Sequence, residues 1–149
     1  MSGLGQDEAD IRALAAAWSW ALEAKDLDGL TAGYAPDVLL YDLKPPYRTD
    51  GADAMRRTWA ACLPCFPAKF ESEHRDFEVT VGGDVAFAHG LHHIVPIGEA
   101  SRAGETWMRV TLCYRRIGGA WKVVHEHVSV PYDPMTGRVV NITDADIGN

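Results

Sequence analysis

The sequence has few basic residues, few cysteines and no long apolar run. Its 14 lysines and arginines face 21 aspartates and glutamates, so the formal net charge is -7. A phosphate backbone repels such a chain, and no basic cluster offsets the balance, so we expect no nucleic-acid partner. No apolar run is long enough to cross a bilayer, so we expect no membrane partner either.

Cysteine usage and the start of the chain suggest a cellular compartment. Three cysteines are an odd number in a chain of 149 residues, a length at which a hydrophobic core makes a disulfide framework unnecessary. The first ten residues have neither the basic start nor the apolar stretch of a secretory signal. We therefore expect a reduced, cytoplasmic protein that forms one domain over residues 1–149.

Helical patterns fill the first part of the chain. Apolar residues recur at helical spacing from Ile11 to Leu22, which predicts a helix with one buried face. A short second helix is predicted over Leu27–Tyr34, and a third helix begins after a cap at Thr49 or Asp50. Between them, the apolar stretch Val38–Asp42 predicts a short buried strand.

Strand patterns fill the second part. Glycine pairs separate long alternating segments, and a change of apolar parity after Phe70 predicts a bulge near His74. The predicted strands are Phe70–Val81, Val85–Ile97, Glu105–Ile117 and Trp121–Val130. This order predicts an α+β fold, in which the N-terminal helices close off a curved antiparallel sheet and leave a concave face that suits a ligand.

The last predicted strand carries two histidines at alternate positions. Strict alternation places Trp121, His125 and His127 on one face and Glu126 on the other. The histidine spacing fits no standard zinc pattern, so we expect no metal and no cofactor. If this face is turned toward a pocket, we expect His125 and His127 to shuttle protons or to hydrogen-bond an organic ligand.

Asp42 ends a very apolar strand. Loss of hydration in such surroundings disfavours a carboxylate and raises its pKa, which suits a base that removes a proton next to a carbonyl. The alternative is an exposed acid at the end of a strand. Arg109 shares a strand face with Trp107 and Thr111, and if that face is inward Arg109 needs an anion such as Asp42. The alternative there is a surface arginine.

Several segments together resemble a known family. They are Leu30–Asp42, Gly51–Met55, Gly83–His89 and Trp121–Ser129. In their order and spacing they are similar to the SnoaL-like, ketosteroid-isomerase-like branch of the nuclear transport factor 2-like superfamily. The resemblance covers nearly the whole chain. It implies a cone-shaped α+β barrel with a deep pocket, packed through its sheet as a homodimer.

The resemblance also implies a site. Asp42 matches the aspartate base of steroid isomerases, which works beside a tyrosine and a neutral acid that hold the oxyanion. Here the first helix offers Trp18 and Trp20 in place of the tyrosine, so Arg109 or His127 would have to stabilise an enolate. The residues expected to line the pocket are Trp18, Tyr34, Tyr41, Trp59, His92, Trp107, Thr111 and His125.

These observations predict a protein that binds a small apolar or carbonyl-containing molecule. As an isomerase-, cyclase- or dehydratase-type enzyme it would use Asp42 as base, with His127 and Arg109 as catalytic partners. The alternative is a ligand-binding or oligomerisation module without chemistry. The closing segment Trp121–Ser129 also resembles the association domain of a calmodulin-dependent kinase, which only assembles oligomers.

Overall fold

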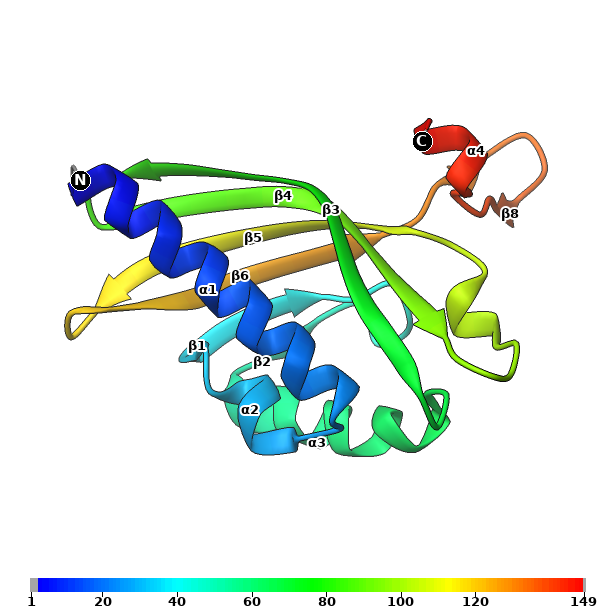
Figure 1. Ribbon diagram of the computed structural model, residues 1–149, viewed down its shortest axis with the longest axis horizontal. Helices are drawn as coiled ribbons and strands as arrows, with labels where there is room; N and C mark the ends of the chain where they lie inside the picture. Colours follow the sequence, from blue (N-terminus) through cyan, green and yellow to red (C-terminus); the bar gives the residue numbers. More distant parts are fainter. Residues whose placement is uncertain (1–2, 149) are drawn as a thin grey trace.

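The computed structural model describes residues 3–148 and has the predicted α+β architecture. Six strands form one curved sheet in the order β2-β1-β6-β5-β4-β3 (Figure 1). The strands are β1 (Tyr34–Tyr41), β2 (Thr49–Asp50), β3 (Phe70–Gly82), β4 (Val85–Pro96), β5 (Met108–Ile117) and β6 (Ala120–Ser129).

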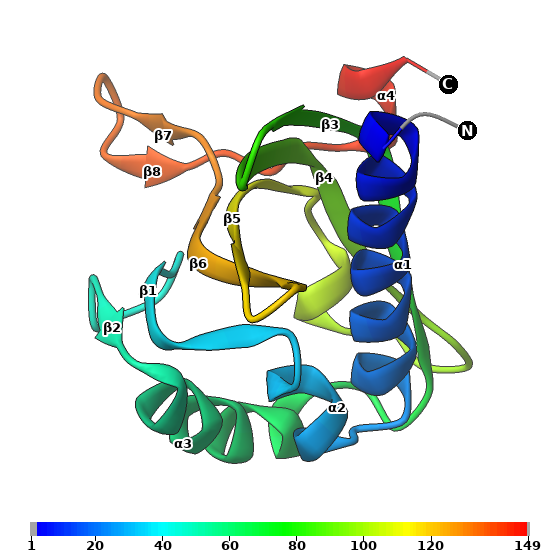
Figure 2. The same ribbon diagram turned by 90° about the vertical axis from the view of Figure 1, so that its left-hand side faces the viewer.

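Three N-terminal helices border the concave side of this sheet. Helix α1 (Gly3–Glu23) runs along β3, while α2 (Leu27–Thr31) and α3 (Ala52–Cys62) lie beneath it (Figure 2). The apolar stripe of α1 is buried as expected, with Ile11 and Leu22 inaccessible to solvent. No helix within residues 3–148 is long and apolar enough to cross a membrane.

The sheet is mixed and not wholly antiparallel. Strand β1 runs parallel to β6, and every other neighbouring pair is antiparallel. The chain between β1 and β6 contains a helix and three long strands. It is therefore long enough to return β6 to the side of β1 in the parallel sense.

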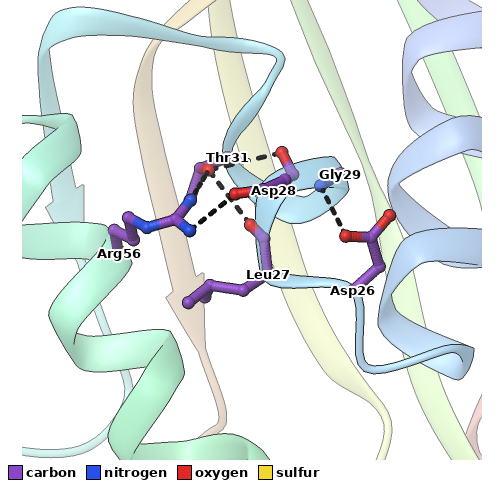
Figure 3. A network of polar contacts seen from close by, with 6 residues as sticks. All are labelled: Asp26, Leu27, Asp28, Gly29, Thr31 and Arg56. Carbon is purple, nitrogen blue, oxygen red and sulfur yellow. Dashed lines mark hydrogen bonds and ion pairs between the residues drawn. The ribbon is translucent and has the colours of Figure 1, made fainter.

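Helix α2 is short and depends on its polar contacts (Figure 3). The Asp26 carboxylate caps it by accepting the Gly29 N–H at 3.2 Å. Arg56 of α3 forms an ion pair with Asp28 and donates to the Thr31 hydroxyl. These contacts fasten α2 to α3, and both helices supply residues to the cavity described below.

The start of α3 differs from the prediction. The residue before the helix is Gly51, at φ 89°, and it provides no side-chain cap. Thr49 and Asp50, which were expected to cap α3, instead form β2 and pair with Leu40 and Leu39 of β1. A 3-10 turn, Leu63–Cys65, follows α3.

The predicted bulge in β3 exists, slightly further along the chain than expected. The register between β3 and β4 shifts between Arg75 and Glu78, and Asp76 takes φ 54°. Opposite the bulge, a Cβ on Gly90 would approach the Arg75 carbonyl oxygen to 3.0 Å. The absence of a side chain at Gly90 therefore lets the two strands bend together here.

A second bulge, in β6, was not predicted and determines which residues face the concave side. Cys113 of β5 pairs with His125, but the next residue, Tyr114, pairs with Val123. Val124 is therefore the extra residue, and strict alternation fails at this point. Trp121 and Val123 face inward before the bulge, and Glu126 faces inward after it.

The C-terminal segment packs against the face of the sheet opposite the helices, near Trp107 just before the start of β5. It forms a hairpin of β7 (Tyr132–Asp133) and β8 (Arg138–Val139), then helix α4 (Asp144–Ile147). Trp107 bridges to Ile142, and its indole N–H donates to Asp144 at 2.7 Å.

Candidate ligand cavity

A cavity of about 340 Å³ lies between the three helices and the concave face of the sheet. Its lining is mostly apolar and includes Leu14, Leu30, Met55, Ile94, Val110 and Leu112. Polar side chains gather on two walls of this cavity. The carboxylate wall is Tyr34, Asp42 and Glu126, from β1, the residue after it, and β6, and the histidine wall is His74 and His92, from β3 and β4.

Glu126 is the most deeply buried acid of the cavity. Its Oε1 accepts the Tyr34 hydroxyl at 3.2 Å. Burial, assisted by the negative charge of Asp42, raises the pKa of Glu126 to about 7, although the Tyr34 bond works against this shift. Burial and the nearby Glu126 charge also raise the pKa of Tyr34. The pair therefore stays largely uncharged below neutral pH.

Asp42 also lines the cavity, next to a loop that reaches its edge. The Asp42 Oδ1 accepts the Leu43 N–H at 2.7 Å, and Oδ2 lies 3.9 Å from the Lys44 ammonium. Leu43 and Lys44 line the cavity and are exposed, so this is the end of the carboxylate wall that meets solvent. Two carboxyl groups in one cavity thus have different surroundings.

The histidine wall is uncharged near neutral pH. Burial lowers the pKa of His92 to about 3, with the nearby His74 and His93 adding to this effect. Burial also lowers the pKa of His74. The two rings lie 4.8 Å apart between centroids, and Ser72 Oγ lies 2.7 Å from His92 Nε2.

Trp18 of α1 lies between the two walls. Its ring is 5.2 Å from that of His92 and 6.0 Å from that of Trp59. The indole N–H of Trp18 is buried and completes no hydrogen bond with any described residue, although it lies near enough to Tyr34 to lower that pKa slightly. An unpaired buried donor at a cavity wall is a position where a ligand acceptor would be favoured.

Five of the sequence-predicted residues meet at this cavity. They are Asp42, Trp18, Tyr34, Trp59 and His92. Trp20, considered as an alternative to Trp18, is 69% exposed on the outer side of α1. The helical spacing therefore separates two tryptophans that lie only two positions apart.

Three predicted residues of β1 and β6 lie instead on the outer face of the sheet. Tyr41, His125 and His127 form an aromatic cluster there, with Tyr41 5.0 Å from the His125 ring and 5.5 Å from that of His127. His125 Nδ1 contacts the Leu39 carbonyl oxygen at 2.8 Å. The expectation that these three line the pocket is wrong. The bulge at Val124 interrupts the alternation in β6, and Tyr41 lies on the face of β1 opposite to that of Leu40, which lines the cavity.

The face of β5 that was predicted to point into the pocket also lies on the outer side of the sheet. Val110, Leu112 and Tyr114 face the cavity, so Arg109 and Thr111 are exposed on the opposite side. Arg109 donates to the Ser129 hydroxyl at 3.2 Å and does not meet Asp42. Trp107 is buried, but by the C-terminal segment and by the side chains of His93 and Arg75.

Sequence reasoning missed Glu126 and His74. Glu126 had been assigned to the wrong face of its strand, by the same error of alternation that placed the histidines inward. His74 had been used only to locate the bulge. A usable signal was present for Glu126, since an acid flanked by Val124 and Val128 in a core strand requires burial or a partner.

Within residues 3–148, no group of three or more histidines, cysteines, aspartates or glutamates is arranged to hold a metal ion. One wall carries two carboxyl groups and a phenol, and the other carries two neutral imidazoles. Such a cavity can bind a small, largely apolar molecule with oxygen atoms at its ends.

Comparisons with known proteins place this architecture in a family. The model of the SnoaL-like domain matches residues 11–133. An NTF2-like protein of unknown function from Pseudomonas putida KT2440 is 31% identical, with a TM-score of 0.85 over 92% of this chain and 95% of that one. No functionally curated protein matches the chain.

Two more distant structures share the fold. A "putative dehydratase from the NTF2-like family" of Streptomyces avermitilis is 19% identical, with a TM-score of 0.71 over 85% of this chain and 97% of that one. A "putative calcium/calmodulin-dependent protein kinase type II association domain" from Thiobacillus denitrificans ATCC 25259 is 21% identical, with a TM-score of 0.66 over 79% and 92%. The chain thus belongs to the SnoaL-like domain family of the NTF2-like superfamily.

Proposed function

We propose that the protein is an enzyme that removes a proton next to the carbonyl group of a small, largely apolar molecule. The observation that carries the proposal is the pair of carboxyl groups, Asp42 and Glu126, in one apolar cavity with different surroundings. Acids placed in this way can divide the roles of base and acid between them. Isomerisation, cyclisation and dehydration all begin with this step.

The surroundings of the two carboxyl groups suggest their roles. Asp42, beside Lys44 at the solvent end, acts as the carboxylate base that takes the proton from carbon. The electron pair of the broken C–H bond moves to the carbonyl oxygen. Glu126 in its neutral form, held by Tyr34, donates a hydrogen bond to that oxygen and stabilises the enolate.

The exchange of the α-hydrogens of 2-tetralone, an enolisable bicyclic ketone, for deuterium tests this proposal. Proton NMR in D2O follows the exchange rate, and quenching of Trp18 and Trp59 fluorescence reports binding of the ketone. We expect catalysed exchange that Asp42→Asn slows by roughly 10²-fold or more, the effect typical of losing a general base. Binding is retained in this variant because the cavity keeps its shape.

Asp37→Asn is the matched control, since Asp37 is an exposed acid of β1, the strand that Asp42 follows, and does not line the cavity. The pH dependence gives a second reading. Exchange by the unsubstituted protein falls as Glu126 ionises above pH about 7, and Glu126→Gln, which keeps a neutral donor, loses this fall. Exchange that survives Asp42→Asn unchanged excludes Asp42 as the base.

A ligand-binding module without turnover is the second candidate. The observation that favours it is that both Asp42 oxygens already have partners, the Leu43 N–H and the Lys44 ammonium. Under this alternative 2-tetralone binds and quenches tryptophan fluorescence, but no exchange above the buffer rate is seen at any pH. The kinase-type association domain with the same fold is compatible with it.

The expected homodimer is also retained as a proposal. Val85 and Phe87 are 57% and 46% exposed on β4, next to Ile117 of β5 on the same sheet. Exposed apolar side chains on a sheet face favour burial against a second copy. Sedimentation equilibrium of the protein and of Phe87→Asp tests this, and a dimer unaffected by the substitution would place the interface elsewhere.

A further inference from the structure

A hydrogen-bonded chain of four side chains leads from the cavity to a separate surface groove. His92 Nε2 contacts Ser72 Oγ at 2.7 Å, and Ser72 Oγ contacts Ser19 Oγ at 2.9 Å. Ser19 Oγ in turn contacts His74 Nδ1 at 3.2 Å. Ser19 comes from α1, and the other three residues come from β3 and β4.

The two ends of this chain have different surroundings. His92 is buried and lines the cavity, but does not line the groove. Ser19, Ser72 and His74 line the groove between α1 and β3, and His74 lines the cavity as well. Glu23, which also lines the groove, accepts the Ser72 backbone N–H at 2.8 Å and so fixes the position of Ser72.

The order of hydrogens along the chain has two solutions in which both serine hydroxyls donate within the chain. In the first, His92 carries its hydrogen on Nδ1, Ser72 donates to His92, Ser19 donates to Ser72, and His74 Nδ1 donates to Ser19. In the second, every shared hydrogen points the other way, and both histidines carry their hydrogen on Nε2. Each solution pairs both hydroxyls and the two ring nitrogens of the chain without any net charge.

We propose that Ser19, Ser72, His74 and His92 are a proton relay that joins the cavity to the groove. Going from the first order to the second, each shared hydrogen moves one bond along the chain. His92 gives its Nδ1 hydrogen to an oxygen of the bound ligand, and His74 takes one at Nε2 from groove water. One proton leaves the groove and one reaches the ligand, so the chain itself stays neutral.

The relay extends the proposed function, on which it rests, by supplying a second acid–base group on the wall opposite Asp42 and Glu126. It also specifies the ligand further, since the end near His92 must carry an oxygen that can accept a proton. The depressed pKa values of His92 and His74 agree with neutral rings that pass protons on without retaining them.

The order of hydrogens can be tested without turnover. Long-range ¹⁵N–¹H NMR of labelled protein at pH 7.5 identifies the nitrogen that carries the hydrogen in each ring. We expect His74 and His92 to carry it on the same-named nitrogen, or to show matching averaged shifts. Opposite assignments in the two rings would mean either a missing contact or a serine hydroxyl that donates outside the chain, and either would overturn the relay.

If the relay exists, a substitution at His74 must determine which ring nitrogen of His92 carries the hydrogen. An aspartate in His74→Asp can only accept, which forces Ser19 to donate to it, Ser72 to donate to Ser19, and His92 to carry its hydrogen on Nε2. Adding Ser19→Ala cuts the chain while keeping the new charge, so this preference of His92 disappears. A His92 that ignores His74→Asp, or keeps the preference in the double variant, contradicts the relay.

Turnover gives the final reading. 3-Hydroxycyclohexanone carries a second oxygen that leaves as water after taking the proton from His92, and Ser19→Ala lowers kcat for this loss of water roughly tenfold with KM unchanged, less than the loss expected for Asp42→Asn. Ser129→Ala, on the outer face, is the matched control. An unchanged kcat excludes the relay. Absence of exchange in the unsubstituted protein excludes the proposed function, and the NMR readings still decide the order of the chain.

Discussion

The two polar walls of the cavity respond to burial in opposite ways. On the carboxylate wall, loss of water raises the pKa of Glu126 to about 7. On the histidine wall, the same loss lowers the pKa of His92 to about 3. Burial disfavours whichever form is charged, so it keeps an acid protonated and a base unprotonated. The deep part of both walls is therefore close to neutral at pH 6, a setting that suits an apolar ligand.

The largest effect is expected on the histidine wall. The pKa of His92 is depressed from 6.5 to about 3, so its contribution to stability is complete above pH 6.5 and is lost as the pH falls towards 3. Over the whole window this amounts to roughly 5 kcal/mol. We expect His92→Gln to remove most of this dependence, as measured by urea unfolding between pH 7.5 and 3. Equal acid sensitivity of the variant would show that His92 is not the group responsible.

On the carboxylate wall the dependence has the opposite sign and is smaller. The pKa of Glu126 is raised from 4.5 to about 7, so its contribution to stability is complete below pH 4.5 and is lost as the pH rises through 7. The change is on the order of 3 kcal/mol. Glu126→Gln should unfold with a free energy that no longer falls over this range. A variant as pH-sensitive as the original protein would contradict the assignment.

Tyr34→Phe increases the difference in pKa between the groups of the two walls. Without the Tyr34 hydroxyl, the Glu126 carboxylate loses the hydrogen bond that lowers its pKa, so this pKa rises further. We expect a loss of about 1–2 kcal/mol in the free energy of unfolding, the usual effect of removing one partner of a buried hydrogen bond. Carbon-13 NMR of the Glu126 carboxyl measures the shift, and a lowered pKa would exclude this arrangement.

The smallest effect lies outside both walls. Arg56→Ala removes an ion pair with the exposed Asp28 and a bond to Thr31, which together join α2 to α3 (Figure 3). An exposed pair of this kind contributes at most about 1 kcal/mol. The pH dependences of His92 and Glu126 should be unchanged in urea unfolding of this variant. A change in either pH dependence would mean that the contact between α2 and α3 affects the pKa values of His92 or Glu126.

Much of the fold was predictable because its signals are local. Helical spacing identified the buried stripe of α1, and glycine pairs located the hairpins between the long strands. The parallel pairing of β1 with β6 was not predictable, because strand direction depends on the path of the whole chain between them. Helix α4 was too short to leave a periodic pattern.

The site was predicted in part, because the residues whose orientation follows from local spacing were placed correctly and the others were not. Trp18 and His92 reach the cavity because regular spacing holds in their elements up to those residues, and Asp42 reaches it directly after the end of β1. His127 does not, because one extra residue in β6 shifts every later side chain to the other face. Trp107 is buried as an aromatic residue should be, but under a C-terminal segment whose position no local pattern indicates.

The sequence by itself determined the order of helices and strands, the apolar character of the core and the family resemblance, since these depend on local spacing and on segment order. Only the tertiary structure decided which face of each strand is inward. A bulge adds a single residue and costs little locally, but it placed Glu126 at the cavity and His125 and His127 outside it. The closing strand therefore contributes an acid to the cavity, and its two histidines lie outside.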